Sequence, residues 1–251
     1  GILKKDSIIV EPTSGNQGIG LALVGAVKGY ETVIIMPDSV SQERRFLVEH
    51  YGAKVILVHD AGNIGDCINE CVKTANRMAA ENPKVFVPQQ FENEANPTAH
   101  RRQTALEILE QVAGPIDGFC SGIGTGGTIT GIGEALKEAN PNITIWAVEP
   151  ENAAILAGGN VGTHIQMGIG DGVVPKVLNQ HIYEDITIIS DEEALNTSKD
   201  LARLEGLMCG ISSGTNVAAA LKLAKKLGAG KTVVTLLPDT AERYFSTPLF
   251  G

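Results

Sequence analysis

Hydrophobic positions along this chain follow two alternating patterns, short β-branched runs and longer segments with helical spacing. In the first part of the chain, the runs that predict strands are 7–11, 31–36, 54–58 and 84–87, and the segments that predict helices are 18–28, 41–51, 64–81 and 97–112. In the second part, the predicted strands are 116–121, 143–148, 186–189 and 232–237, and the predicted helices are 128–139, 190–205 and 215–227. Strands that alternate with helices predict an α/β fold, in which helices cover both faces of a parallel sheet.

The alternation stops between Glu149 and His181, in a stretch that contains six glycines. A long irregular segment inside a regular fold is typical of an ordered loop beside a functional site. Regular structure resumes at Ser190, where Ser-Asp-Glu-Glu is a capping-box start for a helix. We place a lobe boundary near residues 92–96.

The charge of the chain limits its partners. It carries 20 Lys+Arg against 29 Asp+Glu, a formal net charge of −9. This balance argues against nucleic acid and anionic membranes as partners, and no apolar run reaches membrane-spanning length. Among the four cysteines, Cys67 and Cys71 have no second Cys or His pair, so we predict no metal site. Free thiols and the lack of an export signal predict a reducing cytoplasm.

A glycine-rich turn at Gly122-x-Gly124-x-x-Gly127 joins a predicted strand to a predicted helix. Such a turn presents backbone N–H groups to a phosphate, with the helix dipole behind them. One interpretation is a dinucleotide site, with Glu149 as the ribose-binding acid. Another is a single phosphate monoester, held also by the hydroxyls of Thr125 and Thr128. A third is a tight turn that binds nothing. No Gly-Lys-Ser/Thr follows, which excludes a nucleoside-triphosphate loop.

A second strand-to-helix turn carries a run of hydroxyl and amide side chains. Thr13, Ser14, Asn16 and Gln17 follow the predicted strand 7–11, at the start of the next helix. Ser14 or Asn16 alone is explained as a helix N-cap, but the whole run predicts a site for a carboxylate.

These segments together resemble a known family. Glu11-Pro12-Thr13-Ser14-Gly15-Asn16 resembles the substrate loop of the O-acetylserine sulfhydrylase (cysteine synthase) family, which consists of pyridoxal-phosphate enzymes of fold type II (tryptophan synthase β-like). Other segments that agree in order and kind are Gln89-Gln90-Phe91 with Asn96-Pro97, Gly124-Thr125-Gly126-Gly127-Thr128, Gly168-Ile169-Gly170, Gly210-Ile211-Ser212-Ser213-Gly214 and Glu242-Arg243-Tyr244. The resemblance spans essentially the whole chain and displaces the dinucleotide interpretation.

The resemblance implies a cofactor, pyridoxal 5′-phosphate, and a role for each matching residue. It implies that the cofactor is bound by Asn16, Gly124, Thr125, Gly126, Gly127, Thr128 and Ser212, and the amino-acid substrate by Thr13, Ser14, Gln17, Gln90 and Gly168. Within these sets, Asn16 is implied to bind the 3′-oxygen of the ring and Ser212 its pyridine nitrogen. A neutral hydroxyl there leaves that nitrogen unprotonated, which favours β-elimination over transamination. The implied reaction makes L-cysteine from O-acetyl-L-serine and sulfide.

The chain departs from the family pattern in one respect that affects catalysis. The family's Schiff-base lysine lies upstream of the Thr-Ser-Gly-Asn loop, and the residues before Thr13 do not resemble its segment. We therefore assign no catalytic residue, expect a chain that lacks its N-terminal part, and predict that it is inactive by itself. The alternative is a catalytically dead relative with a binding or regulatory role. Gln17 replaces the usual Thr, and Asp171 adds an acid after Gly170.

The resemblance also implies a two-lobed organisation, with a small mobile lobe at residues 6–92 and a large cofactor-binding lobe at 93–251. It implies a homodimer, with serine acetyltransferase as a further partner. Two related activities stay open as alternatives, a cystathionine β-synthase-like reaction and the β-elimination of serine or cysteine.

Overall fold

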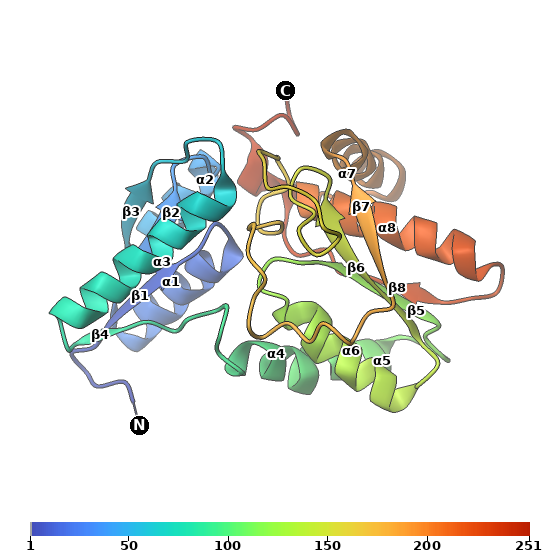
Figure 1. The fold of residues 1–251 in the computed structure, drawn as a ribbon, viewed down its shortest axis with the longest axis horizontal. Helices are drawn as coiled ribbons and strands as arrows, with labels where there is room; N and C mark the ends of the chain where they lie inside the picture. Colours follow the sequence, from blue (N-terminus) through green and yellow to red (C-terminus); the bar gives the residue numbers. More distant parts are fainter. Residues whose placement is uncertain (1) are drawn as a thin grey trace. The chain divides into compact units, whose positions relative to one another are not determined.

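The computed structural model describes residues 2–251, which form two compact units (Figure 1). The first unit comprises residues up to Gln90 together with Val161–Thr163 and Glu242–Gly251. The second comprises Phe91–Asn160 and His164–Ala241. The expected division at 92/93 into a small mobile lobe and a large cofactor-binding lobe stays a prediction.

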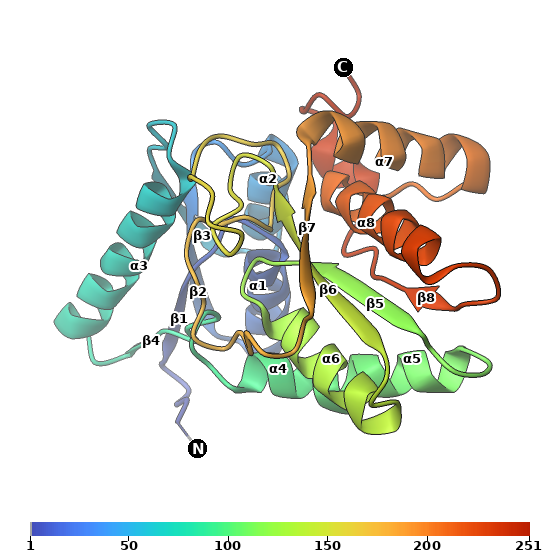
Figure 2. The same ribbon diagram turned by 45° about the vertical axis from the view of Figure 1, so that its right-hand side comes forward.

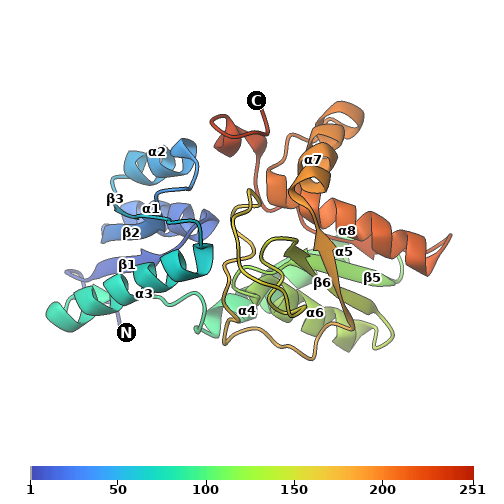
Figure 3. The same cartoon turned by 45° about the horizontal axis from the view of Figure 1, so that its top comes forward.

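The first unit is a four-stranded parallel sheet with strand order β3-β2-β1-β4. Its elements are β1 (Ile8–Pro12), α1 (Asn16–Lys28), β2 (Glu31–Pro37), α2 (Gln42–His50), β3 (Lys54–Val58), α3 (Ile64–Glu81) and β4 (Val85–Phe86). Residues Ile34 and Met36 of β2 pack against α1 and α2, whereas Val33 and Ile35 pack against α3. Since successive residues of a strand face opposite sides, α1 and α2 cover one face of the sheet and α3 covers the other (Figure 3).

The second unit is also a four-stranded parallel sheet, with strand order β7-β6-β5-β8. Its elements are α4 (Ala95–Ala99), a π-helical turn (His100–Thr104), α5 (Ala105–Gln111), β5 (Gly118–Gly122), α6 (Gly127–Ala139), β6 (Thr144–Pro150), β7 (Asp185–Ile189), α7 (Asp191–Glu205), α8 (Ile211–Leu227) and β8 (Val233–Val234). A short 3₁₀ turn, Ala241–Tyr244, follows. Helices α4 to α6 lie on one face of this sheet, and α7 and α8 lie on the other (Figure 2).

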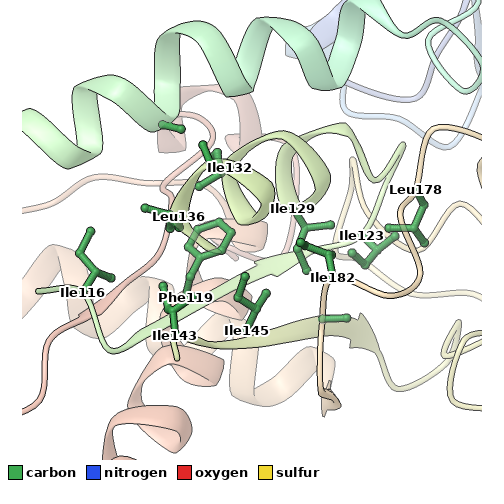
Figure 4. Packing of buried hydrophobic residues seen from close by; sticks show 13 residues of the cluster. Ile116, Phe119, Ile123, Ile129, Ile132, Leu136, Ile143, Ile145, Leu178 and Ile182 are labelled. Carbon is green, nitrogen blue, oxygen red and sulfur yellow. The ribbon is translucent and has the colours of Figure 1, made fainter. Parts of the chain in front are cut away.

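The core of the second unit lies between α6 and the strands β5 and β6. Phe119 and Ile145 point from the sheet toward Ile129, Ile132 and Leu136 of α6 (Figure 4), and all five are at most 1% exposed. Helix α6 begins at Gly127, and the close packing beneath it holds this N-terminus in a defined position on the sheet.

These elements confirm the α/β class and most of the predicted order. Between β6 and β7 the chain contains neither helix nor strand, as the glycine-rich stretch predicted. Two predicted helices differ. The helix expected at 97–112 is divided by the π-helical turn at His100–Thr104. The helix expected from Thr215 begins at Ile211, so that Ser212 lies in its first turn.

Candidate active site

The turn after β5 has the form of a phosphate site. Gly126 adopts a left-handed conformation (φ 77°), and α6 begins at the next residue. Within residues 2–251, the backbone N–H groups of Gly124, Thr125 and Gly126 donate no hydrogen bond. Three unbonded N–H groups at a helix N-terminus match the demands of a phosphate, which supplies acceptor oxygens and negative charge.

The glycines of this turn are required by close neighbours. A Cβ atom at Gly124 would lie 2.4 Å from the carbonyl oxygen of Gly168, and one at Gly127 would lie 2.0 Å from Oδ1 of Asn96. Any side chain at either position would therefore displace backbone or the Asn96 amide. The same close approach shows that the structure brings Gly124 and Gly168 together.

The two threonines of the turn are held by residues of α4 and the π-helical turn. Thr125 Oγ1 accepts hydrogen bonds from Asn96 Nδ2 (2.8 Å) and from the Gly127 N–H (3.3 Å), so its own proton can be donated to an anion. Thr128 Oγ1 lies 3.3 Å from His100 Nε2, and burial lowers the pKa of His100. A neutral imidazole beside Thr128 leaves the positive potential of the turn to its backbone.

Helix α8 carries Ser212 and is joined to the end of β5. Asn216 Oδ1 accepts a hydrogen bond from the Gly122 N–H (2.7 Å), and its Nδ2 donates to the carbonyl oxygen of Leu236 (2.8 Å). Ser212, one turn earlier on α8, is 4% exposed. Asn216 therefore joins α8, which carries Ser212, to the end of β5, from which the glycine-rich turn leads to α6.

The predicted substrate residues, apart from Gly168, lie in the first unit, where Thr13, Ser14 and Gln90 gather at the carboxyl end of β1. Thr13 Oγ1 accepts from the Gly15 N–H (3.1 Å), and Gln90 Nε2 donates to the carbonyl oxygen of Pro12 (2.7 Å). The carboxylate of Glu11, the residue before Pro12, accepts hydrogen bonds from the N–H groups of Gln89 (2.9 Å) and Gln90 (2.8 Å). Parallel sheets bind their ligands at this end.

Asn16 and Gln17 begin α1, and the structure gives Asn16 a role other than capping. The N-cap of α1 is Gly15, and no side chain caps the helix. Asn16 Oδ1 instead accepts a hydrogen bond from Nη1 of Arg243 at 2.9 Å. Gln17 is exposed. The simple N-cap interpretation of Asn16 is therefore wrong.

The structure also explains why Glu149 is not a ribose-binding acid. Its carboxylate accepts the N–H groups of Leu156 and Ala157, both at 3.0 Å, and the side chain is 2% exposed. It fixes the start of the long irregular segment. Within residues 2–251, no group of three or more His, Cys, Asp or Glu is placed to hold a metal, and no helix is long and apolar enough to cross a membrane.

Sequence reasoning missed the residues that support the site. In the sequence, Asn96 stands out only as part of an Asn-Pro motif, and the pattern indicates no role for His100, Asn216 or Arg243. Each acts through another residue, so only the hydrogen-bond partner identifies it.

Two parallel α/β sheets, an amide-lined turn after β5 and a serine in the first turn of α8 agree with one class of protein, the fold-type II pyridoxal-phosphate enzymes. The family model "Pyridoxal-phosphate dependent enzyme" matches residues 2–239, and the chain belongs to this family. The residues present fit the cofactor, since the turn offers three free N–H donors and a hydroxyl where a phosphate is needed.

Similarity to characterised proteins narrows the class and confirms the resemblance to cysteine synthases. The chain is 47% identical to a cysteine synthase of Staphylococcus aureus (strain N315), over 100% of this chain and 80% of the relative. It also resembles the crystal structure of cysteine synthase from Entamoeba histolytica (TM-score 0.90, 40% identity, 99% of this chain and 72% of that one). A third match is the O-acetylserine-dependent cystathionine β-synthase of Helicobacter pylori (TM-score 0.93, 35% identity, 100% and 80%).

Proposed function

We propose that this chain takes part in pyridoxal-phosphate-dependent β-replacement, which makes L-cysteine from O-acetyl-L-serine and sulfide. The observation that carries the proposal is the turn at Gly124, Thr125 and Gly126, with three N–H groups free for a phosphate. The cysteine synthase of Staphylococcus aureus, 47% identical over all of this chain, supports the choice of reaction.

When bound, pyridoxal phosphate supplies an electron sink for chemistry at the α- and β-carbons of an amino acid. We propose that the turn from Gly124 to Thr128 holds its phosphate and that the hydroxyl of Ser212 donates a hydrogen bond to the unprotonated pyridine nitrogen. The amide of Asn16 would donate to the 3′-oxygen of the ring. Thr13, Ser14, Gln17, Gln90 and Gly168 would bind and orient the amino acid.

We further propose that residues 1–251 by themselves do not complete the reaction, because none of their lysines matches the family's Schiff-base lysine. The test is borohydride reduction of the chain after incubation with pyridoxal phosphate, followed by peptide mapping. The expected result is no single lysine labelled in stoichiometric amount. One lysine labelled to completion would contradict this proposal.

The β-elimination of serine or cysteine is the second candidate, because of an acid beside the site. Asp171 is 7% exposed, and its Oδ2 lies 3.5 Å from the position that a Cβ of Gly124 would occupy. A carboxylate there repels hydrosulfide, which is negatively charged, but not water. In a longer chain that includes the lysine segment, Asp171→Asn should therefore shift the ratio of the two activities toward cysteine formation.

Two assays test the main function. Isothermal titration with pyridoxal phosphate should show one site, and Thr125→Ala or Ser212→Ala should weaken it. Cysteine formation is then measured with O-acetylserine and sulfide, on this chain and on a longer chain that includes the lysine segment. A wild-type chain that binds no pyridoxal phosphate would contradict the proposal. A chain that binds cofactor, shows no activity in either form and captures a protein partner would indicate the regulatory alternative.

We also propose a homodimer in a reducing cytoplasm, with serine acetyltransferase as a partner. The thiols of all four cysteines are free and buried, which agrees with a reducing compartment. Light scattering coupled to gel filtration tests the dimer, and co-elution with an acetyltransferase tests the partner. Elution as a monomer would contradict the first.

A further inference from the structure

The side chain of Arg243 reaches a residue that lies 227 positions earlier in the chain. Its Nη1 donates to Oδ1 of Asn16 at 2.9 Å, and the contact is partly buried. Both residues belong to the first compact unit, although Arg243 comes from the C-terminal segment, Glu242–Gly251.

Helix α2 and the residue before it hold the C-terminal segment in place. Ser41 Oγ donates to the carbonyl oxygen of Arg243 itself at 2.7 Å. Arg44 Nη2 donates to the hydroxyl of Tyr244 at 2.6 Å, and the guanidinium carbon lies 4.6 Å from the centre of the Tyr244 ring. Arg44 and Tyr244 are 1% and 0% exposed, so this contact is a buried anchor.

A second anchor follows immediately. The carboxylate of Glu43 accepts the N–H of Ser246 at 3.0 Å and its hydroxyl at 2.8 Å. The backbone of Arg243 is thus fixed at its own carbonyl group and on its C-terminal side, and its side chain starts from a defined position. A long side chain that starts from a fixed backbone loses less conformational freedom when it makes one hydrogen bond.

The hydrogen bond between Arg243 and Asn16 determines the orientation of the Asn16 side-chain amide. A guanidinium has donors and no acceptor, so only the oxygen of the amide can face Arg243. The NH₂ group of Asn16 must then point away from Arg243. The positive charge also withdraws electron density from the amide, which makes its N–H bonds stronger donors.

We propose that Arg243 is a positioning residue, which turns the NH₂ group of Asn16 toward the 3-oxygen of pyridoxal phosphate and strengthens that hydrogen bond. The proposal rests on the proposed function, in which Asn16 contacts this oxygen. In this proposal the effect of Arg243 on the cofactor passes through the amide of Asn16. A bond that favours the ionised 3-oxygen should lower the pH at which the bound ring loses its phenolic proton.

The test uses 4-deoxypyridoxine 5′-phosphate, which keeps the phosphate and 3-hydroxyl but has no aldehyde, and so cannot form a covalent bond with any lysine. Fluorescence titration of the 251-residue chain gives its dissociation constant, and absorbance over a pH series gives the ionisation midpoint of the bound 3-hydroxyl. The variants are Arg243→Gln, Asn16→Ala and the double variant. Arg77→Gln, an exposed arginine of α3 in the same unit, is the matched control.

Arg243→Gln should weaken binding about ten-fold, the effect expected for one charge-assisted hydrogen bond, and should raise the ionisation midpoint of the ligand. If Arg243 acts on the ligand through Asn16, as proposed, the double variant should bind within about two-fold of Asn16→Ala alone. Arg77→Gln should match the wild type. Arg243→Lys keeps the charge and one donor, so it should restore part of the binding and the midpoint even if Arg243→Gln folds poorly.

Losses that add fully in the double variant would overturn the proposal, since they would mean that Arg243 acts on the ligand directly or through the fold. If both Arg243 variants kept the wild-type dissociation constant and the wild-type ionisation midpoint of the bound ligand, the proposal would be overturned as well, while the proposed function would stand. A wild-type chain that does not bind the analogue would overturn the proposed function and this inference together.

Discussion

Glu11 should make the stability of the first unit depend on pH near neutrality. Its side chain is fully buried at the end of β1, where it accepts the N–H groups of Gln89 and Gln90. Burial raises the pKa of Glu11 from 4.5 to about 7, against the two hydrogen bonds, which lower it. The burial effect is the larger because two neutral N–H donors replace only part of the water lost by the carboxylate.

The sign and size of the effect follow from linkage. A carboxyl whose pKa is higher in the folded than in the unfolded state binds its proton more tightly when folded. Its contribution to the free energy of unfolding is therefore complete below pH 4.5, falls as the pH rises, and is lost above about pH 7. At about 1.4 kcal/mol per pKa unit, the loss across this window is about 3 kcal/mol.

The assay compares wild type with Glu11→Gln by urea unfolding at pH 5, 6, 7 and 8, followed by far-ultraviolet circular dichroism. The amide is neutral throughout, so the variant should gain about 3 kcal/mol relative to wild type between pH 5 and pH 8. At pH 5 it should be the less stable by about 1 kcal/mol, because an amide NH₂ replaces one acceptor oxygen.

Glu107→Gln, at an exposed glutamate of α5, is the control for the chemical change alone. The ¹³Cδ shift of labelled glutamate gives the pKa of Glu11 directly. A stability difference for Glu11→Gln that does not vary with pH, or a carboxyl that titrates near pH 4.5, would refute the reasoning.

Three further changes test the supports of the site. Gly124→Ala should lower the free energy of unfolding by about 1–3 kcal/mol and weaken pyridoxal phosphate binding at least ~10-fold, because the new Cβ would lie 2.4 Å from the Gly168 oxygen. Gly20→Ala is the matched control: its Cβ would have nothing within 4 Å, so it should stabilise the chain by about 0.5–1 kcal/mol. Gln166→Leu should lower the free energy of unfolding in urea by about 2–4 kcal/mol, because the fully buried amide makes hydrogen bonds with Ile189 and Thr215. Gln89→Gly should raise the melting temperature, with a gain of about 1 kcal/mol, because φ is 60° there.

Local pattern was sufficient for most elements because their signals lie within a few residues. The run at 54–58 and the helix at 64–81 have the bounds that periodicity predicted. Ser190 accepts the Glu193 N–H, as the capping box requires. Such features depend on neighbouring side chains and backbone groups, which the sequence displays directly.

Where pattern failed, a tertiary contact overrode local preference. The pattern predicts a helix that starts at Thr215, after the glycines and serines of residues 210–214, yet α8 begins at Ile211. A Cβ atom at Gly214 would lie 2.1 Å from the carbonyl oxygen of Ala194, so the glycine is there to let α7 approach α8. Its low helix propensity is offset by that packing. In the same way, Gly131 of α6 lies against the carbonyl oxygen of Pro97, near the point where the expected helix 97–112 is interrupted.

The sequence by itself determined the α/β class, the order of the elements and the two turns that bear the predicted cofactor and substrate residues. Only the tertiary structure decided which residues support them: Asn96 on Thr125, Asn216 on Gly122 and Arg243 on Asn16. The reason is that each of these is a single hydrogen bond between residues 29, 94 and 227 positions apart. A contact of that kind leaves no periodic trace in the chain, and it exists only once the packed strands and helices have brought its two partners together.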